Sequence, residues 1–223
     1  MEGIPRKPAP TSMSRLVHRF ALVACLAWAA SGCETTAPYE YGPTEAGLGD
    51  AEVGRPAFTV GDEFWFDTRG GSIFVEVFAG EDNGRLVFRR DLQQETFLYT
   101  PDLALIAIRR PFGSDQRFDP HDGRLEFPLK VGKTWARTFR VSSTDAQRTV
   151  QRTRRCEVID AGQASVPAGR FAALRIECTL RELGASRVVR EEVVYAPAVG
   201  RIIAHSTRDR SVDVRLTEFS RAP

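Results

Sequence analysis

Two arginines, Arg152 and Arg154, are the strongest candidates for binding chemistry in the sequence. They lie in the segment RTVQRTRRCEV, where strict alternation puts them on the same face as Cys156 and Val158. Guanidinium groups on an apolar face cost free energy unless they are paired or hydrated, and they bind carboxylates and phosphates with defined geometry. Three interpretations are open: the strand extends past the core into solvent, a bulge reverses the alternation, or a concave face opens to an anionic ligand. The third makes both arginines candidate ligand-binding residues.

Other residues that could bind a metal or catalyse a reaction are few. The segment FDPHDG groups Asp119, His121 and Asp122, but no second cluster of metal ligands accompanies them, and a turn explains the sequence. His205, in RIIAHST, stands alone in a predicted strand. The sequence has no GxSxG, HExxH or phosphate-binding glycine loop. We therefore expect no catalytic residue, no metal and no cofactor, and an enzyme is the least favoured function.

Cys33 follows a segment typical of an export signal. Arg15 and Arg19 precede an apolar run of eleven residues, 20–30 (FALVACLAWAA), which is too short to span a bilayer. Met13 is an alternative start. Residues 30–33 (ASGC) resemble the lipobox of bacterial lipoproteins, with alanine in place of the commoner leucine three residues before the cysteine. The resemblance implies that residues 1–32 are a signal peptide and that Cys33 is acylated.

The residue after Cys33 bears on localisation. In lipoproteins of Gram-negative bacteria, aspartate at this place often signals retention in the inner membrane, and this chain has Glu34. The resemblance therefore implies an outer-membrane anchor with the domain facing the periplasm, and the inner membrane is the less favoured alternative. Each buried CH2 of an acyl chain contributes roughly 0.8 kcal/mol, so two or three chains would hold the protein firmly.

Composition limits the partners and the number of domains. Removal of residues 1–32 takes away four of the 31 Lys and Arg residues and one of the 29 Asp and Glu residues, which leaves 27 basic and 28 acidic residues. This near-neutral balance gives no indication of a nucleic-acid partner. Residues 33–56, rich in Gly, Pro, Thr and acids, are predicted to form a flexible tether, and residues 57–223 a single periplasmic domain.

The hydrophobic pattern of the domain has a period of two. Residues 73–78, 174–181 and 212–217 alternate in this way, and turn-forming residues interrupt the pattern about every ten residues. The pattern predicts an all-β antiparallel meander of about eleven or twelve strands, forming a β-sandwich or a curved open-barrel sheet. Residues 103–108 (LALIAI) are apolar on both faces and are predicted to form a central strand.

The clearest predicted hairpin surrounds residues 166–169 (VPAG), which suit a type I turn. Folding the chain there places residues whose numbers sum to 334 opposite one another. Three cross-strand pairs are therefore expected, namely Cys156 with Cys178, Val158 with Ile176, and Asp160 with Leu174.

The two cysteines of this hairpin are predicted to form a disulfide. Cys25 would leave with the signal peptide and Cys33 would carry the lipid, so Cys156 and Cys178 remain as a pair. An oxidising periplasm favours the bond. Closing a loop of about twenty residues contributes roughly 3 kcal/mol in the chain-entropy model.

Three segments together resemble a known group of proteins. They are FPLKVGKTW (127–135), VPAGRF (166–171) and YAPAVGRI (195–202). Their order and spacing are similar to those of uncharacterised bacterial envelope proteins, many of them lipoproteins, over residues 118–219. The resemblance implies a β-rich fold and no particular activity. Each segment also has a structural explanation as a turn flanked by core residues.

We therefore expect a lipid-anchored periplasmic protein that acts without catalysis, as an envelope accessory domain bound to a protein or cell-wall partner. The alternative is a carrier or sensor of an amphipathic or anionic ligand, held in a curved sheet with Arg152 and Arg154 at its mouth. A core filled by side chains would favour the first function, and a large apolar cavity would favour the second. Acids and a histidine that converge in a cleft would favour an enzyme.

Overall fold

The computed structural model describes residues 39–42, 48–49, 51–145 and 149–223. The predicted signal peptide and Cys33 lie outside these ranges. The described chain is all β, as predicted, with thirteen strands. Their bounds are β1 Glu40–Gly42, β2 Glu63–Thr68, β3 Ile73–Asp82, β4 Arg85–Arg90, β5 Glu95–Tyr99, β6 Leu105–Arg109, β7 Gln116–Asp119, β8 Thr134–Ser143, β9 Thr149–Val166, β10 Gly169–Glu182, β11 Val188–Ala196, β12 Arg201–Thr207 and β13 Asp213–Ser220.

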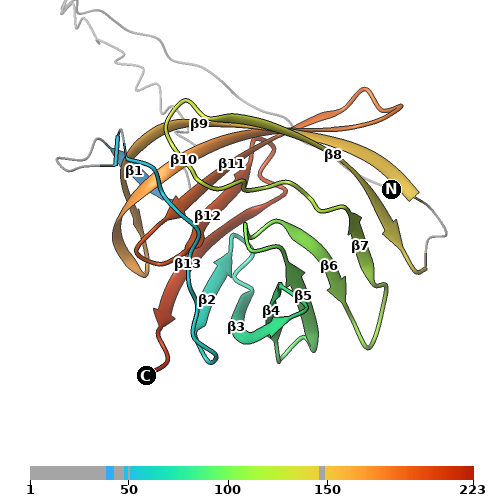
Figure 1. Ribbon diagram of the computed structural model, residues 1–223, viewed down its shortest axis with the longest axis horizontal. Helices are drawn as coiled ribbons and strands as arrows, with labels where there is room; N and C mark the ends of the chain where they lie inside the picture. Colours follow the sequence, from blue (N-terminus) through green and yellow to red (C-terminus); the bar gives the residue numbers. More distant parts are fainter. Residues whose placement is uncertain (1–38, 43–47, 50, 146–148) are drawn as a thin grey trace, which may run out of the picture. The chain divides into compact units, whose positions relative to one another are not determined.

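Strands β2 to β13 form an antiparallel meander that closes on itself. Each strand pairs with the next along the chain, β13 pairs with β2, and β8 pairs with β9. The result is a closed barrel of twelve strands with β1 added outside it, and Figure 1 shows the strands curving around a common interior. The predicted antiparallel meander is confirmed, and the ladder between β13 and β2 closes it into a barrel. The run 103–108 contributes β6, which is paired on both sides, with β5 and β7.

In the part of the chain that the structure describes, no helix is long and apolar enough to cross a membrane.

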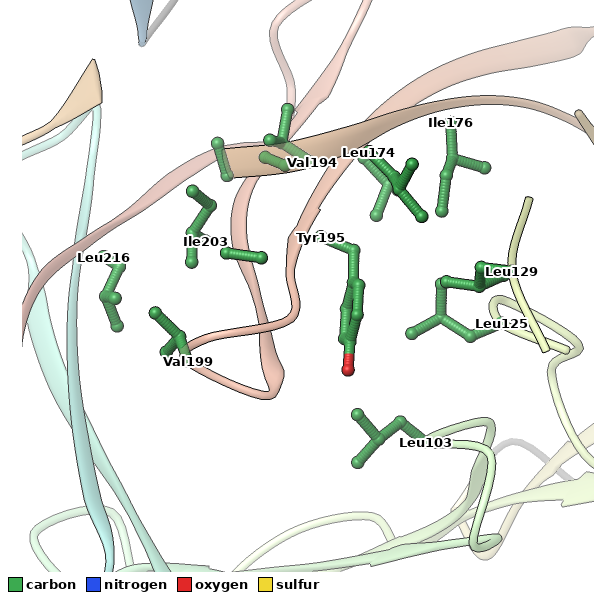
Figure 2. Close-up of a cluster of buried hydrophobic side chains, with 14 of the residues drawn as sticks. Leu103, Leu125, Leu129, Leu174, Ile176, Val194, Tyr195, Val199, Ile203 and Leu216 are labelled. Atoms are coloured by element: carbon green, nitrogen blue, oxygen red, sulfur yellow. The ribbon is translucent and has the colours of Figure 1, made fainter. Parts of the chain in front are cut away.

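The barrel interior is filled from both sides. Apolar side chains of β10 to β13 face inward, and the connection between β7 and β8, residues 120–133, folds back into the interior. Figure 2 shows Leu125 and Leu129 of this connection on one side of Tyr195, below Leu174 and Ile176 in the view, with Ile203 and Leu216 on the other side of Tyr195. Leu129 also exchanges two backbone hydrogen bonds with Val53. We call residues 120–133 the inner segment.

The predicted hairpin forms at VPAG, with β9 ending at Val166 and β10 beginning at Gly169. Cys156 pairs with Cys178, and the two sulfur atoms form a disulfide with an S–S distance of 2.02 Å. The expected pairing of Asp160 with Leu174 is wrong, because a bulge shifts the register and Asp160 pairs with Arg175. The bulge places an extra residue in β9 between the disulfide and the turn.

Part of the predicted tether belongs to the domain. Residues 40–42 form β1, which pairs with the end of β9, and Tyr39 is 6% exposed. The Tyr39 hydroxyl donates a hydrogen bond to Glu192, and Val53 is buried against the inner segment. This corrects the expectation that all of residues 33–56 would be flexible, because Tyr39 and Val53 in that segment pack against the barrel domain.

Candidate functional site: a charged cluster in the barrel interior

Arg154 points into the barrel and is 3% exposed. Its Nη1 lies 2.8 Å from a carboxylate oxygen of Asp122 and 2.7 Å from the Asp122 carbonyl oxygen, and its Nη2 lies 3.2 Å from Glu191. Asp122 belongs to the inner segment and Glu191 to β11. The alternation of β9 is therefore kept from Arg152 to Val158, and the protein's own carboxylates take the place of an external anion.

Arg152 shares this face but lies nearer the end of the barrel. Its side chain is 34% exposed and lies 3.0 Å from Glu182 of β10. The interpretation in which both arginines reach solvent is therefore wrong for Arg154, which is buried, whereas Arg152 retains partial access to water.

A second group of buried charges lies on β3, β4 and β12. Glu76 is 3% exposed and forms ion pairs with Arg90, at 2.6 Å, and with Arg201. The Arg90 guanidinium also lies 3.8 Å from the centre of the Phe74 ring, and that of Arg201 lies 4.2 Å from the centre of Phe88. One carboxylate thus satisfies two cations, and the aromatic faces favour both of them.

A cavity of about 130 Å³ lies between the two groups and is partly open to solvent. Its polar wall carries Glu76, Asp122, Arg124, Arg201 and His205. Arg90 and Tyr99 also line it, and the remaining lining residues are apolar: Phe66, Phe74, Leu103, Ile202, Ile203, Ala204 and Val214. The cavity is therefore small, and its lining combines charged and apolar side chains.

The buried carboxylates are held in their ionised form. Burial opposes the ionisation of Asp122, but the guanidinium groups of Arg154 and Arg124 and a hydrogen bond from the Leu105 amide outweigh it, so the pKa of Asp122 lies below its usual range. The same balance holds for Glu76, where Arg201 and Arg90 overcome burial and lower the pKa.

His205 is held in its neutral form. Burial first, and then the positive charges of Arg124 and Arg154, lower its pKa from 6.5 to about 3, against an opposing effect of Asp122. The Nε2 atom is buried and has no hydrogen-bond partner among the described residues. From the sequence alone, His205 is an isolated residue of a predicted strand, whereas in the structure it lines the cavity.

We expect the low pKa of His205 to make the fold sensitive to mild acid. Between pH 6.5 and about 3 the unfolded chain binds a proton at this residue and the folded chain does not, so stability falls as the pH falls through this window. At pH 4.5 the loss is of the order of 2 kcal/mol. Urea unfolding of wild type and His205→Gln from pH 7.5 to 4.5 checks this, because the variant should lose less stability. Parallel pH profiles would contradict it.

The segment FDPHDG does not gather its side chains around one point. His121 Nδ1 accepts a hydrogen bond from the Gly123 amide at 3.2 Å, while the Asp122 carboxylate is engaged by Arg154. Within the described ranges, no group of three or more His, Cys, Asp or Glu residues is placed to hold a metal ion. Asp122 of the inner segment instead forms an ion pair with Arg154 of β9.

The comparisons with known proteins concern the fold. No family model matches the chain, and no curated protein matches it. Among solved structures, the hypothetical lipoprotein YmcC from Escherichia coli (K12) is similar with a TM-score of 0.51 at 9% identity, over 73% of this chain and 85% of YmcC. A protein from Bacteroides fragilis described as having a YmcC-like fold gives a TM-score of 0.47 at 12% identity, over 76% of this chain and all of the other. The chain therefore has a fold similar to that of YmcC.

Proposed function

We propose that the chain is a lipoprotein anchored through Cys33 to the outer membrane, and that its periplasmic β domain acts without catalysis by binding an envelope partner. The observation that carries the proposal is the interior of the barrel. Most of it is filled by the protein's own side chains, and most of its buried charges form ion pairs with one another. The outer surface is then left as the place where a large partner can bind.

The interior contains carboxylates and a histidine in one cavity, the arrangement that would favour an enzyme. General acid–base catalysis requires groups whose pKa values lie near the working pH. Here the pKa values of Asp122 and Glu76 are lowered, and that of His205 falls to about 3. Near neutral pH these groups neither take up nor release a proton. The cluster therefore favours a structural and electrostatic role.

The size of the cavity disfavours a carrier of amphipathic molecules. Pockets that enclose drug-sized ligands have volumes of about 300–1,000 Å³. The interior cavity measures about 130 Å³, and Leu125 and Leu129 occupy the space beside Tyr195. An acyl chain would have to displace the inner segment.

The partner surface is proposed to lie at the hairpin tips. Leu92, Phe112 and Leu183 are 86%, 84% and 75% exposed and lie in the connections β4–β5, β6–β7 and β10–β11. In an antiparallel meander these alternate connections share one end of the barrel. β1 pairs near the β9–β10 connection, at the opposite end. These three exposed apolar side chains therefore lie at the end of the barrel away from β1.

Replacement of Cys33 tests the anchor. In cells supplied with radiolabelled palmitate, wild type should be labelled and sediment with outer membranes, and Cys33→Ser should lose the label and its membrane association. Cys25→Ser, within the apolar run, is the matched control and should behave as wild type. A photo-crosslinker at Phe112 should give a discrete adduct in these cells, whereas one at Val60, at the opposite end and 64% exposed, should not. Labelled Cys33→Ser, or identical adducts at both positions, would contradict the proposal.

A further inference from the structure

The charged cluster has one more cation than it has carboxylates. Its guanidinium groups are Arg90, Arg124, Arg154 and Arg201, and its carboxylates are Glu76, Asp122 and Glu191. The neighbouring pair of Glu95 with Arg110, at 2.5 Å, adds one charge of each sign and leaves the excess unchanged. A single excess charge in a secluded site creates an attractive field for one monovalent anion.

Arg124 is the cation with unused hydrogen-bonding capacity. Its closest carboxylate is Asp122 at 3.5 Å, and Asp122 is already held at 2.8 Å by Arg154. In the described chain the Arg124 side chain donates no hydrogen bond, and its buried Nε has no partner. The other cations of the cluster are each within 3.2 Å of a carboxylate. The excess charge is therefore located at Arg124.

Two neutral polar groups share the cavity wall with Arg124. His205 Nε2 is buried without a partner and remains uncharged, and burial raises the pKa of the Tyr99 hydroxyl to about 12, so that it keeps its proton. Both groups can hydrogen-bond an oxygen of an anion. Glu76 and Asp122 lie in the same wall and would repel a second negative charge, so the cavity selects a monoanion over a dianion.

The remaining wall sets the shape of the ligand. The cavity lining also provides apolar surface, from Phe66, Phe74, Ile202 and Val214. A cavity of about 150 Å³ in another protein holds a benzene molecule, and this cavity measures about 130 Å³. The space suits a planar carboxylate group with an apolar body of a few carbon atoms, and a guanidinium matches a carboxylate with two parallel hydrogen bonds.

We propose that the barrel interior binds a small monocarboxylate with an apolar body, whose carboxylate is held by Arg124 together with Tyr99 and His205. The site goes beyond the proposed function, since it requires neither the lipid anchor nor the hairpin tips. It also differs from the site expected from the sequence, because Arg154 serves as an internal ion-pair partner and Arg124 carries the uncompensated charge.

Butyrate is the probe for this site, and butyramide is its uncharged counterpart of nearly the same shape. Titration calorimetry on the mature lipoprotein in detergent should show saturable binding of butyrate, at least tenfold tighter than that of butyramide or inorganic phosphate. Arg124→Gln should weaken butyrate binding at least tenfold. Arg137→Gln is the matched control, because Arg137 is partly exposed and pairs with Glu126 at 3.2 Å, and it should change the affinity less than twofold.

Two further measurements complete the test, one on a second variant and one with a second ligand. Ala204→Leu places a larger side chain in the cavity wall without changing the charge, and it should abolish binding even if Arg124→Gln does not fold. An N-acetylated dipeptide with a free carboxyl end separates the two sources of the ligand: binding would indicate a chain end entering through the opening, and its absence a free small acid. Equal affinity for butyrate and butyramide, no saturable binding of butyrate, or full binding by Ala204→Leu would overturn the proposal.

Discussion

Replacement of Arg154 by methionine is expected to lower the free energy of unfolding by about 3–5 kcal/mol. The side chain is 3% exposed and is the nearest cation to both Asp122 and Glu191. Methionine fills much of the same volume, so the main loss is the charge. Arg124 still lies 3.5 Å from Asp122, but Glu191 stays buried and loses its ion pair with Arg154. Removing one partner of a buried ion pair is costly because the other charge stays desolvated.

Urea unfolding at pH 7, followed by tryptophan fluorescence, measures the effect. Arg152→Met is the matched control, since it makes the same change two residues away on the same face, at a side chain that is 34% exposed and pairs with Glu182. A partly exposed pair contributes about 0–1 kcal/mol, so this variant should stay within that range. Similar losses in the two variants would show that the cluster does not stabilise the fold through charge.

The strands of the barrel could be predicted from the sequence because their signals are local. Leu174, Ile176 and Cys178 alternate with polar residues and all three are buried, and Pro and Gly mark the turn between β9 and β10. The bulge between the disulfide and the turn could not be predicted. It adds one residue to β9 with no interruption of the apolar pattern, so the register moves by one where the sequence gives no signal.

The candidate site depends on contacts between distant parts of the chain. Arg154 was identifiable because it stands on an apolar face, but its partners are 32 and 37 residues away, on segments whose approach only the barrel determines. The burial of Glu191 could be predicted, since it shares the alternation of the buried Val193. The burial of Glu76 could not, because Ile73 and Val75 suggest that the other face of β3 is buried, yet Ile73 is 63% exposed and Glu76 points inside. Two arginines from other strands make this possible.

Loss of the disulfide is expected to cost about 3 kcal/mol. The bond joins residues 22 apart, and the chain-entropy model assigns roughly this value to a loop of that size. Cys156 and Cys178 are 4% and 2% exposed, so the double variant Cys156→Ala/Cys178→Ala also loses buried sulfur atoms. Urea unfolding of this variant and of wild type, each with and without reductant, measures the difference. Reductant should lower the stability of wild type and leave that of the variant unchanged. Equal stability of the two proteins without reductant would contradict the expectation.

The position of the disulfide predicts which strands are destabilised most when it is removed. Cys156 pairs with Trp135 of β8 on one side and with Cys178 of β10 on the other, next to the last pair of the β8–β9 ladder. Beyond that pair, the second neighbour of β9 is β1. The disulfide therefore fixes β9 to β10 where its support from β8 ends. Hydrogen exchange in the double variant should rise most in the amides of β8 and the adjoining half of β9, and least in β3 and β4. A uniform rise would show that the bond acts on the unfolded chain alone.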